Sequence, residues 1–133
     1  MSTRDHVVLY DDDCGFCRAS LALLLAWDRH RRLRPVPLQS EEAERLLPGL
    51  GPDERMASMH AAPADGPPAS GGAALPALLR EVPGGAPLAA AAARFPRAAE
   101  LGYAAVAGNR SALSKLVPAA LSRRADELVR NRL

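Results

Sequence analysis

The amino-acid sequence predicts a single α/β domain whose four-stranded mixed sheet follows the order β-α-β-α-β-β-α, with additional helices at the C-terminal end. Two observations lead to this prediction. Short apolar segments alternate with helical patterns in the first part of the chain, and every segment after Pro87 has a helical pattern. The length of 133 residues suits one domain, so we expect one unit over 1–133, with a core at about 6–82 and a helical extension over about 87–133.

The first strand is predicted at residues 6–10, where an apolar run ends in acidic residues that favour a turn or a helix start. A helix over about 14–30 follows, with its apolar residues along one side. The second strand is predicted at 33–38. It should lie at an edge of the sheet, because Pro35 and Pro37 cannot donate hydrogen bonds to a ladder. A right-handed crossover places this strand beside the first.

Weaker signals mark the next elements. Ser40 followed by glutamates predicts a helix N-cap with an acidic first turn, and this short helix should end at 48–49. Residues 55–62 predict a weak third strand, 65–66 a turn, and 67–70 a fourth strand.

The remaining segments are predicted to be helical. A helix over 73–81 should open after two glycines, and further helices are expected at 88–94, 96–107 and 111–130. Pro118 lies inside the last of these patterns and should kink or restart the helix.

The charge of the chain excludes some classes of partner. The formal net charge is +2, with a net of −3 over residues 1–93 and +5 over residues 94–133. Such a small excess does not indicate nucleic-acid binding, and the basic end lacks the interleaved aromatic residues of single-strand binders. The first apolar run is too short for a signal peptide, and no apolar stretch could span a bilayer. We therefore expect a cytoplasmic protein that binds neither nucleic acid nor membrane.

The two cysteines, Cys14 and Cys17, lie three positions apart where the first strand gives way to a helix. A bridge between them closes almost no loop, so a structural staple is a poor explanation. A helix N-terminus offers unpaired N–H groups and the positive end of the helix dipole, and both stabilise a thiolate at Cys14. Gly15 removes bulk where a substrate would approach. The pattern predicts thiol–disulfide exchange, with Cys14 as nucleophile and Cys17 as the resolving thiol.

Three acidic residues act against this thiolate. Asp11, Asp12 and Asp13 directly precede Cys14, and like charges disfavour its ionised form, although Arg18 would offset part of the effect. A buried Asp11 could instead accept the proton of Cys17 during resolution, so we include it among the candidate catalytic residues. A simple role in a turn or helix cap is an equally good interpretation of Asp11.

The segment from Val8 to Cys17, with the sequence Val-Leu-Tyr-Asp-Asp-Asp-Cys-Gly-Phe-Cys, resembles the signature of the DCC family of thiol–disulfide oxidoreductases. The residues that give the family its name would here be Asp11, Cys14 and Cys17. The resemblance implies a thioredoxin-like fold. It also implies exchange with a disulfide-containing protein or a small thiol, without a cofactor for the exchange itself and with a separate reductant that recycles the pair.

The resemblance covers most of residues 6–117. It continues in 36–40 and 70–75, and in Tyr103 with Asn109 and Arg110, for which a role in helix capping or ion pairing is the simpler interpretation.

Two departures from the family pattern stand beside this likeness. Asp12 occupies a position where the family commonly has glycine, and 56–58 reads Met-Ala-Ser where thioredoxin-like enzymes carry a cis-proline. These departures leave a non-catalytic, thioredoxin-like binding module as an alternative function.

A thiol-ligated metal or iron–sulfur carrier is the other alternative. Tetrahedral zinc would need two ligands besides the two cysteines, and none of His6, His30 and His60 has a ligand spacing to the pair. Two copies sharing one centre through four cysteines would satisfy the requirement. We assign no metal ligands from the sequence.

Overall fold

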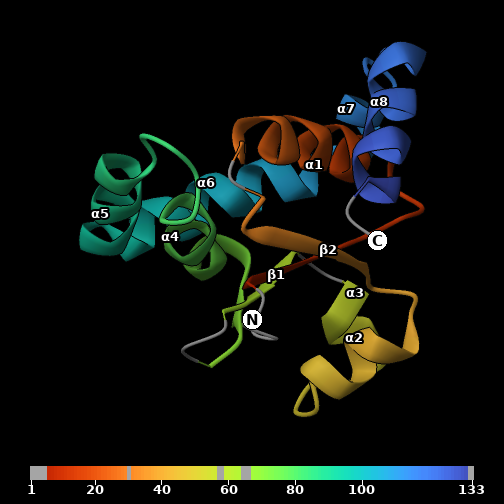
Figure 1. Ribbon diagram of the computed structural model, residues 1–133. Coiled ribbons are helices and arrows are strands. Elements are labelled where there is room, and N and C mark those ends of the chain that lie inside the picture. The colour runs from red at the N-terminus through yellow and green to blue at the C-terminus, as the bar shows by residue number, and fades with distance from the viewer. Residues whose placement is uncertain (1–5, 30, 57–58, 64–66, 132–133) are drawn as a thin grey trace.

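A computed structural model describes residues 6–29, 31–56, 59–63 and 67–131. Its centre is a sheet of four strands in the order β2-β1-β3-β4 (Figure 1). The strands are β1 (His6–Tyr10), β2 (Leu33–Pro37), β3 (His60–Ala62) and β4 (Ala69–Ser70). β1 pairs in parallel with β2 and antiparallel with β3, and β3 pairs antiparallel with β4. The predicted mixed sheet of four strands is confirmed.

Helices cover both faces of this sheet. They are α1 (Gly15–Trp27), α2 (Glu41–Leu46), α3 (Pro52–Met56), the short 3₁₀ helix η1 (Gly71–Ala73), α4 (Ala74–Leu79), α5 (Ala86–Arg94), α6 (Pro96–Gly108), α7 (Arg110–Ser114) and α8 (Ala119–Arg130). Figure 1 shows α1 and α8 on one side of the sheet and α2 and α3 on the other. In the part of the chain that the structure describes, no helix is both long and apolar enough to cross a membrane.

Strand β1 is buried on both of its faces because it lies between two hydrophobic clusters. Val8 and Tyr10 pack with α1, α4 and α8, whereas Val7 and Leu9 pack with β2 and α2. Successive side chains of a strand point to opposite faces, so a central strand needs a continuous apolar run. This requirement explains the uninterrupted apolar sequence before Asp11. The strand ends at Tyr10, directly before the residues of the candidate site.

Strand β2 lies at the edge, as its prolines predict. Pro35 and Pro37 pair in register with Val8 and Tyr10, and the predicted last residue, Leu38, lies just beyond the strand. Its N–H still donates to the carbonyl oxygen of Tyr10 at 2.8 Å. The N-cap predicted for α2 is also confirmed, since Ser40 Oγ accepts from the N–H of Ala43 at 3.3 Å.

Helix α1 ends three residues earlier than predicted, because a buried carboxylate accepts hydrogen bonds from the backbone N–H groups that follow the helix. Asp28 is fully buried, and its two carboxylate oxygens accept from the N–H groups of Arg32 and Leu33 at 3.1 and 2.8 Å. These bonds turn the chain from α1 into β2 and satisfy a charge that would otherwise be costly to bury.

The prediction of the third strand was wrong at its start. Arg55 and Met56 belong to α3, and the strand itself covers only His60–Ala62. Pro52 in the first turn, followed by Asp53 and Glu54, favours a helix, and this local signal outweighs the weak strand pattern.

The predicted fourth strand, 67–70, is likewise shortened to Ala69–Ser70. Its first two residues, Pro67 and Pro68, cannot donate to the ladder. The turn predicted at 65–66 lies outside the described residues.

The later helices follow the predicted order with shifted boundaries. The helix predicted over 73–81 divides into η1 and α4 and ends at Leu79. The long pattern over 111–130 divides at Pro118, whose extended backbone separates α7 from α8. Of the two outcomes expected for this proline, the helix restarts rather than kinks.

Candidate active site

Cys14 is the N-cap residue of α1. Its backbone is extended, with φ −103° and ψ 116°, and its Sγ accepts a hydrogen bond from the N–H of Cys17 at 3.3 Å. An acceptor at this position satisfies one of the unpaired N–H groups of the first helical turn, and a thiolate accepts more strongly than a thiol. The start of the helix therefore stabilises the reactive form of Cys14.

Ser114, at the end of α7, covers the start of α1. Its Oγ accepts from the N–H of Phe16 at 2.9 Å and lies 3.8 Å from Cys14 Sγ. A serine hydroxyl can accept and donate at once, so Ser114 can donate to a Cys14 thiolate while it accepts from Phe16. Ser114 was not predicted as a site residue, because nothing in its local sequence pattern distinguishes it from any other helical serine.

Gly15 lies beneath the same serine. A Cβ atom built on Gly15 would lie 3.6 Å from the Cβ of Ser114, an ordinary van der Waals distance. The space in front of Gly15 is thus occupied by α7 rather than left open, and access to Cys14 has to come from another direction.

Asp11 organises the turn that leads into α1. Its buried carboxylate accepts through Oδ1 from the N–H of Asp13 at 2.9 Å and from Nε2 of Gln39 at 2.8 Å. Its carbonyl oxygen accepts from the N–H of Cys14 at 3.3 Å, and Gln39 Oε1 accepts from the N–H of Asp12 at 3.2 Å. These contacts are those of a turn residue, and a role for Asp11 as proton acceptor of Cys17 stays a prediction.

The other charges near the site are largely balanced among themselves. Arg18 forms an ion pair with Asp126 of α8, and its Nε lies 3.9 Å from Asp12 Oδ1. The positive charge of Arg18 is therefore shared between two carboxylates, which limits what it contributes at Cys14.

Burial, with the negative charge of Asp12 adding to it, raises the pKa of Tyr10 to about 12, so this phenol stays protonated at neutral pH.

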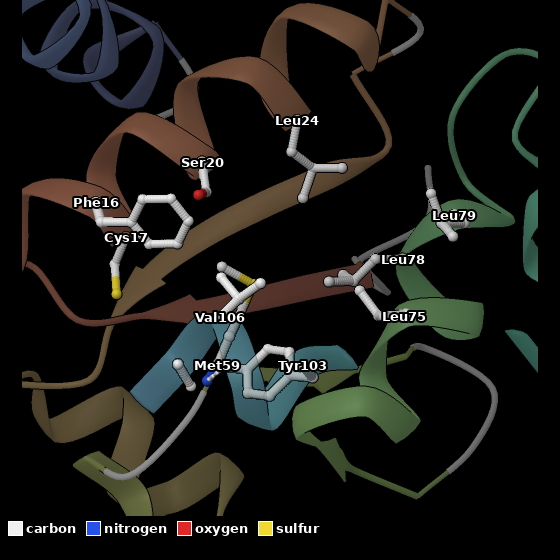
Figure 2. Close-up of a pocket in the computed structure, with 11 residues that line it drawn as sticks. Phe16, Cys17, Ser20, Leu24, Met59, Leu75, Leu78, Leu79, Tyr103 and Val106 are labelled. Carbon is white, nitrogen blue, oxygen red and sulfur yellow. Dashed lines mark hydrogen bonds between the residues drawn. The ribbon is translucent and has the colours of Figure 1, made fainter. Parts of the chain in front are cut away.

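Cys17 lines a pocket of about 260 Å³ next to α1 (Figure 2). Side chains of α1, α4 and α6 surround this pocket, together with Met59, which directly precedes β3. The lining residues are Phe16, Cys17, Ser20, Leu24, Met59, Leu75, Leu78, Leu79, Tyr103, Val106 and Ala107. The two cysteines thus face different surroundings: Cys14 a polar helix start, and Cys17 an apolar pocket.

Tyr103 is placed in this pocket by close packing between α6 and η1. Its hydroxyl oxygen accepts from the N–H of Met59 at 2.6 Å. A Cβ atom on Gly72 would lie 2.6 Å from Cα of Glu100, closer than real side chains approach, so only glycine lets α6 come this near. Gly71, Gly72 and Tyr103 carry part of the family resemblance, and they therefore belong to one contact between η1 and α6.

Asn109, another residue that carries the family resemblance, makes a structural contact. Asn109 lies between α6 and α7, and its Nδ2 donates to the carbonyl oxygen of Ala105 at 2.7 Å, as expected for a residue that ends a helix. Arg110 begins α7, but its side chain lies outside what the structure describes. Of the family departure at 56–58, only Met56 is described, and it ends α3.

His60 is a core residue held by two hydrogen bonds. Its Nε2 donates to the carbonyl oxygen of Arg55 at 2.8 Å, because a carbonyl can only accept, and its Nδ1 then accepts from Ser70 Oγ at 2.6 Å. Burial lowers the pKa of His60.

His6 lies 3.4 Å from Glu81, and His30 is outside the described residues. Among the described residues, no three His, Cys, Asp or Glu side chains gather as metal ligands would.

A mixed sheet with helices on both faces and a C-x-x-C pair at the first helix start defines a thioredoxin-like protein of the thiol–disulfide class. A family model described as DCC1-like thiol-disulfide oxidoreductase matches residues 8–116. This match spans most of the chain, which therefore belongs to that family, and it confirms the resemblance seen in the sequence. No curated protein and no solved structure gives a significant match.

Proposed function

We propose that this protein catalyses thiol–disulfide exchange with Cys14 as nucleophile and Cys17 as resolving thiol. Its substrate would be a disulfide-containing protein or a small disulfide, and a separate reductant would recycle the cysteine pair. The observation that carries the proposal is the position of Cys14 Sγ at the N-cap of α1, where it accepts from the N–H of Cys17 at 3.3 Å.

The exchange consists of two displacements at sulfur. The Cys14 thiolate attacks one sulfur of the substrate disulfide, forms a mixed disulfide and releases the first substrate thiol. Cys17 then attacks Cys14 Sγ, which forms the Cys14–Cys17 disulfide and releases the second thiol. Both electrons come from the cysteine pair, so the exchange needs no cofactor. In a reducing cytoplasm, the predicted location, the pair would start each cycle as two thiols.

The test is a redox titration of the protein in glutathione buffers, read by alkylation of free thiols and mass spectrometry. A reversible two-electron transition between the dithiol and an intramolecular disulfide supports the proposal, and its midpoint gives the direction of electron flow. If no intramolecular disulfide forms at any potential, the exchange mechanism is wrong and a non-catalytic binding module takes its place.

Two variants separate the roles of the cysteines. Cys14→Ser should abolish disulfide reduction, because it removes the attacking thiolate. Cys17→Ser should accumulate a mixed disulfide on Cys14 after a single displacement, visible as a mass increase that dithiothreitol reverses. Normal turnover by Cys14→Ser would contradict the assignment.

A further inference from the structure

The pocket beside Cys17 has walls from three helices and one loop. Phe16, Ser20 and Leu24 extend into it from α1 on the same side as Cys17, facing Met59 and the residues of α4 and α6 (Figure 2). A cavity of about 150 Å³ lined by apolar side chains can hold a benzene molecule. The present pocket, at about 260 Å³, has room for an aromatic ring with substituents.

The residues that line this pocket disfavour a charged ligand. Its polar side-chain groups, apart from the thiol of Cys17, are the hydroxyls of Ser20 and Tyr103, and that of Tyr103 already accepts from Met59. Within the described residues, no charged side chain contributes to the lining. A carboxylate or ammonium group would lose its hydration here without gaining a partner of opposite charge. Glutathione, which carries both, is therefore a poor occupant, and a neutral apolar group is a good one.

The direction of sulfur displacement decides which part of a substrate can lie there. In each exchange step the attacking, central and leaving sulfurs lie close to one line. When Cys17 attacks Cys14 Sγ, the substrate thiol still bonded to Cys14 must be on the side of that sulfur away from Cys17. The space beside Cys17 is consequently closed to this second thiol during the second step. In the first step the leaving sulfur lies beyond the attacked sulfur on the same line, so the group of the first leaving thiol can lie in the pocket if the mixed disulfide turns about the Cys14 side-chain bonds before Cys17 attacks.

We propose that the pocket binds the neutral apolar group of the first leaving thiol, so that the protein's substrates are small organic disulfides with an aromatic or alkyl group on sulfur. This inference rests on the proposed exchange function. The Cys14 thiolate attacks the outer sulfur, the substrate S–S bond breaks, and the departing thiolate in the pocket takes the proton of Cys17. The mixed disulfide turns about the Cys14 side-chain bonds until the retained sulfur lies opposite Cys17, and the resulting Cys17 thiolate then attacks Cys14 Sγ. The second thiolate leaves and takes a proton from water, and two electrons have passed to the substrate.

The first test measures single-turnover thiol release from prereduced protein with three disulfides. They are the neutral aromatic dithiodipyridine, the dianionic aromatic dithiobis(nitrobenzoate) and the small polar hydroxyethyl disulfide. Ser20→Phe places a ring inside the pocket from α1. We expect it to lower the rate with dithiodipyridine about tenfold or more relative to hydroxyethyl disulfide, because a filled pocket can no longer bury the leaving group.

Ala26→Phe is the matched control, since it adds the same ring to an exposed position of the same helix. It should leave all three rates unchanged. Equal effects of Ser20→Phe on dithiodipyridine and hydroxyethyl disulfide, or a wild-type preference for the dianionic disulfide over dithiodipyridine, would overturn the proposal.

A second test uses dipyridyl sulfide, a thioether of similar shape that cannot exchange, with binding followed by calorimetry. Saturable binding to the wild type and to Ala26→Phe, lost in Ser20→Phe, is expected. The mixed disulfide of Cys17→Ser with pyridinethiol should still bind the thioether, because the retained thiol lies outside the pocket. Blocked binding there would refute the assignment to the first leaving thiol.

The two tests also separate this inference from the proposed function. If the wild type reduces none of the three disulfides, the exchange function fails, and thioether binding alone then decides whether the pocket takes neutral aromatic groups. If disulfides are reduced but the thioether does not bind, the exchange function stands and the pocket assignment is wrong.

Discussion

At the scale of single residues, a backbone N–H group and a hydroxyl group lie within hydrogen-bond reach of one sulfur. Cys14 Sγ accepts from the N–H of Cys17 and lies within hydrogen-bond reach of the Ser114 hydroxyl, while Asp11 holds the preceding turn through Gln39. The acidic residues before Cys14 disfavour a thiolate, whereas hydrogen bonds from these two groups to a thiolate would stabilise it. The donor from Ser114 is the one that a substitution can remove without changing the backbone.

Ser114→Ala should lower the reactivity of Cys14. A hydrogen bond to a charged group contributes about 1.5–3 kcal/mol, so we expect the alkylation rate of Cys14 by iodoacetamide at neutral pH to fall about tenfold. Mass spectrometry after short reaction times would measure the rate at Cys14 separately from that at Cys17.

Ser114→Thr is the control for this substitution, because it keeps the hydroxyl and should keep most of the reactivity. If Ser114→Ala reacts as fast as the wild type, the serine only caps Phe16 and does not act on the thiolate.

His60 makes stability depend on pH in a defined direction. Burial lowers the pKa of its imidazole below the ordinary value of 6.5. In the unfolded chain the ring takes up a proton as the pH falls through about 6.5, whereas in the folded protein it stays neutral to lower pH. The unfolded state then binds more protons, so the free energy of unfolding should decrease as the pH falls from 7 toward 5.

Urea unfolding of the wild type and of His60→Gln at several pH values would measure this contribution. We expect the variant to be less stable overall, because it changes a buried side chain that makes two hydrogen bonds, and its stability should fall less steeply below pH 6.5 than that of the wild type. Parallel curves for the two proteins would show that His60 does not titrate differently on folding.

At the scale of elements, the contact between α6 and η1 depends on a missing side chain. A methyl group on Gly72 would meet the backbone of Glu100, which cannot shift without moving α6 and Tyr103 with it. Gly72→Ala should therefore destabilise the protein by about 1–3 kcal/mol, measured by urea unfolding, and weaken thioether binding in the pocket.

Gly102→Ala is a matched control within α6. Apart from the neighbouring backbone of α6, no atom of the described residues lies within 4 Å of a Cβ atom built there, and alanine is more favourable than glycine in a helix interior by up to about 1 kcal/mol. We expect equal or higher stability for this variant. A Gly72→Ala protein as stable as Gly102→Ala would mean that α6 is not held closely against η1.

The elements themselves were largely predictable where a local signal fixes them. The prolines of β2, the N-cap at Ser40 and the break at Pro118 act through rules that involve only nearby backbone, and the structure confirms each. The third strand was misjudged at Arg55 and Met56, because a weak strand pattern there competes with helix-starting residues just before it.

Only the part of the candidate site that lies within one short segment could be predicted from the sequence. Cys14, Cys17 and the helix start lie within one short segment, so their spacing and the strand-to-helix context mark them as candidates. Ser114 and Tyr103 join the site through contacts with residues far away in the sequence, Phe16 and Met59. No periodicity or composition encodes such pairs, because they arise from how α6 and α7 pack on the rest of the domain.

At the scale of the whole molecule, the last helix belongs to the core around the site. Ala125 and Leu128 of α8 are buried in the same cluster as Tyr10 and Leu21. Leu128→Ala should lower the free energy of unfolding by about 2–3 kcal/mol. Urea unfolding followed by circular dichroism should still show one transition, because α8 and the sheet share this cluster.

Leu116→Ala removes the same atoms from a side chain that is 78% exposed, and should change stability by less than about 0.5 kcal/mol. A small effect of Leu128→Ala, similar to that of Leu116→Ala, would show that α8 contributes little to the core.

The contact between Cys14 and Ser114 joins residues 100 positions apart, and this separation has a consequence for synthesis. A ribosome adds about 5–20 residues per second, so the cysteine pair emerges roughly 5–20 seconds before the serine that covers it. During that interval the nascent chain carries two thiols without their hydroxyl donor and without the pocket wall from α6. The contacts of the finished site are thus completed late in translation, after the sheet that carries it has emerged.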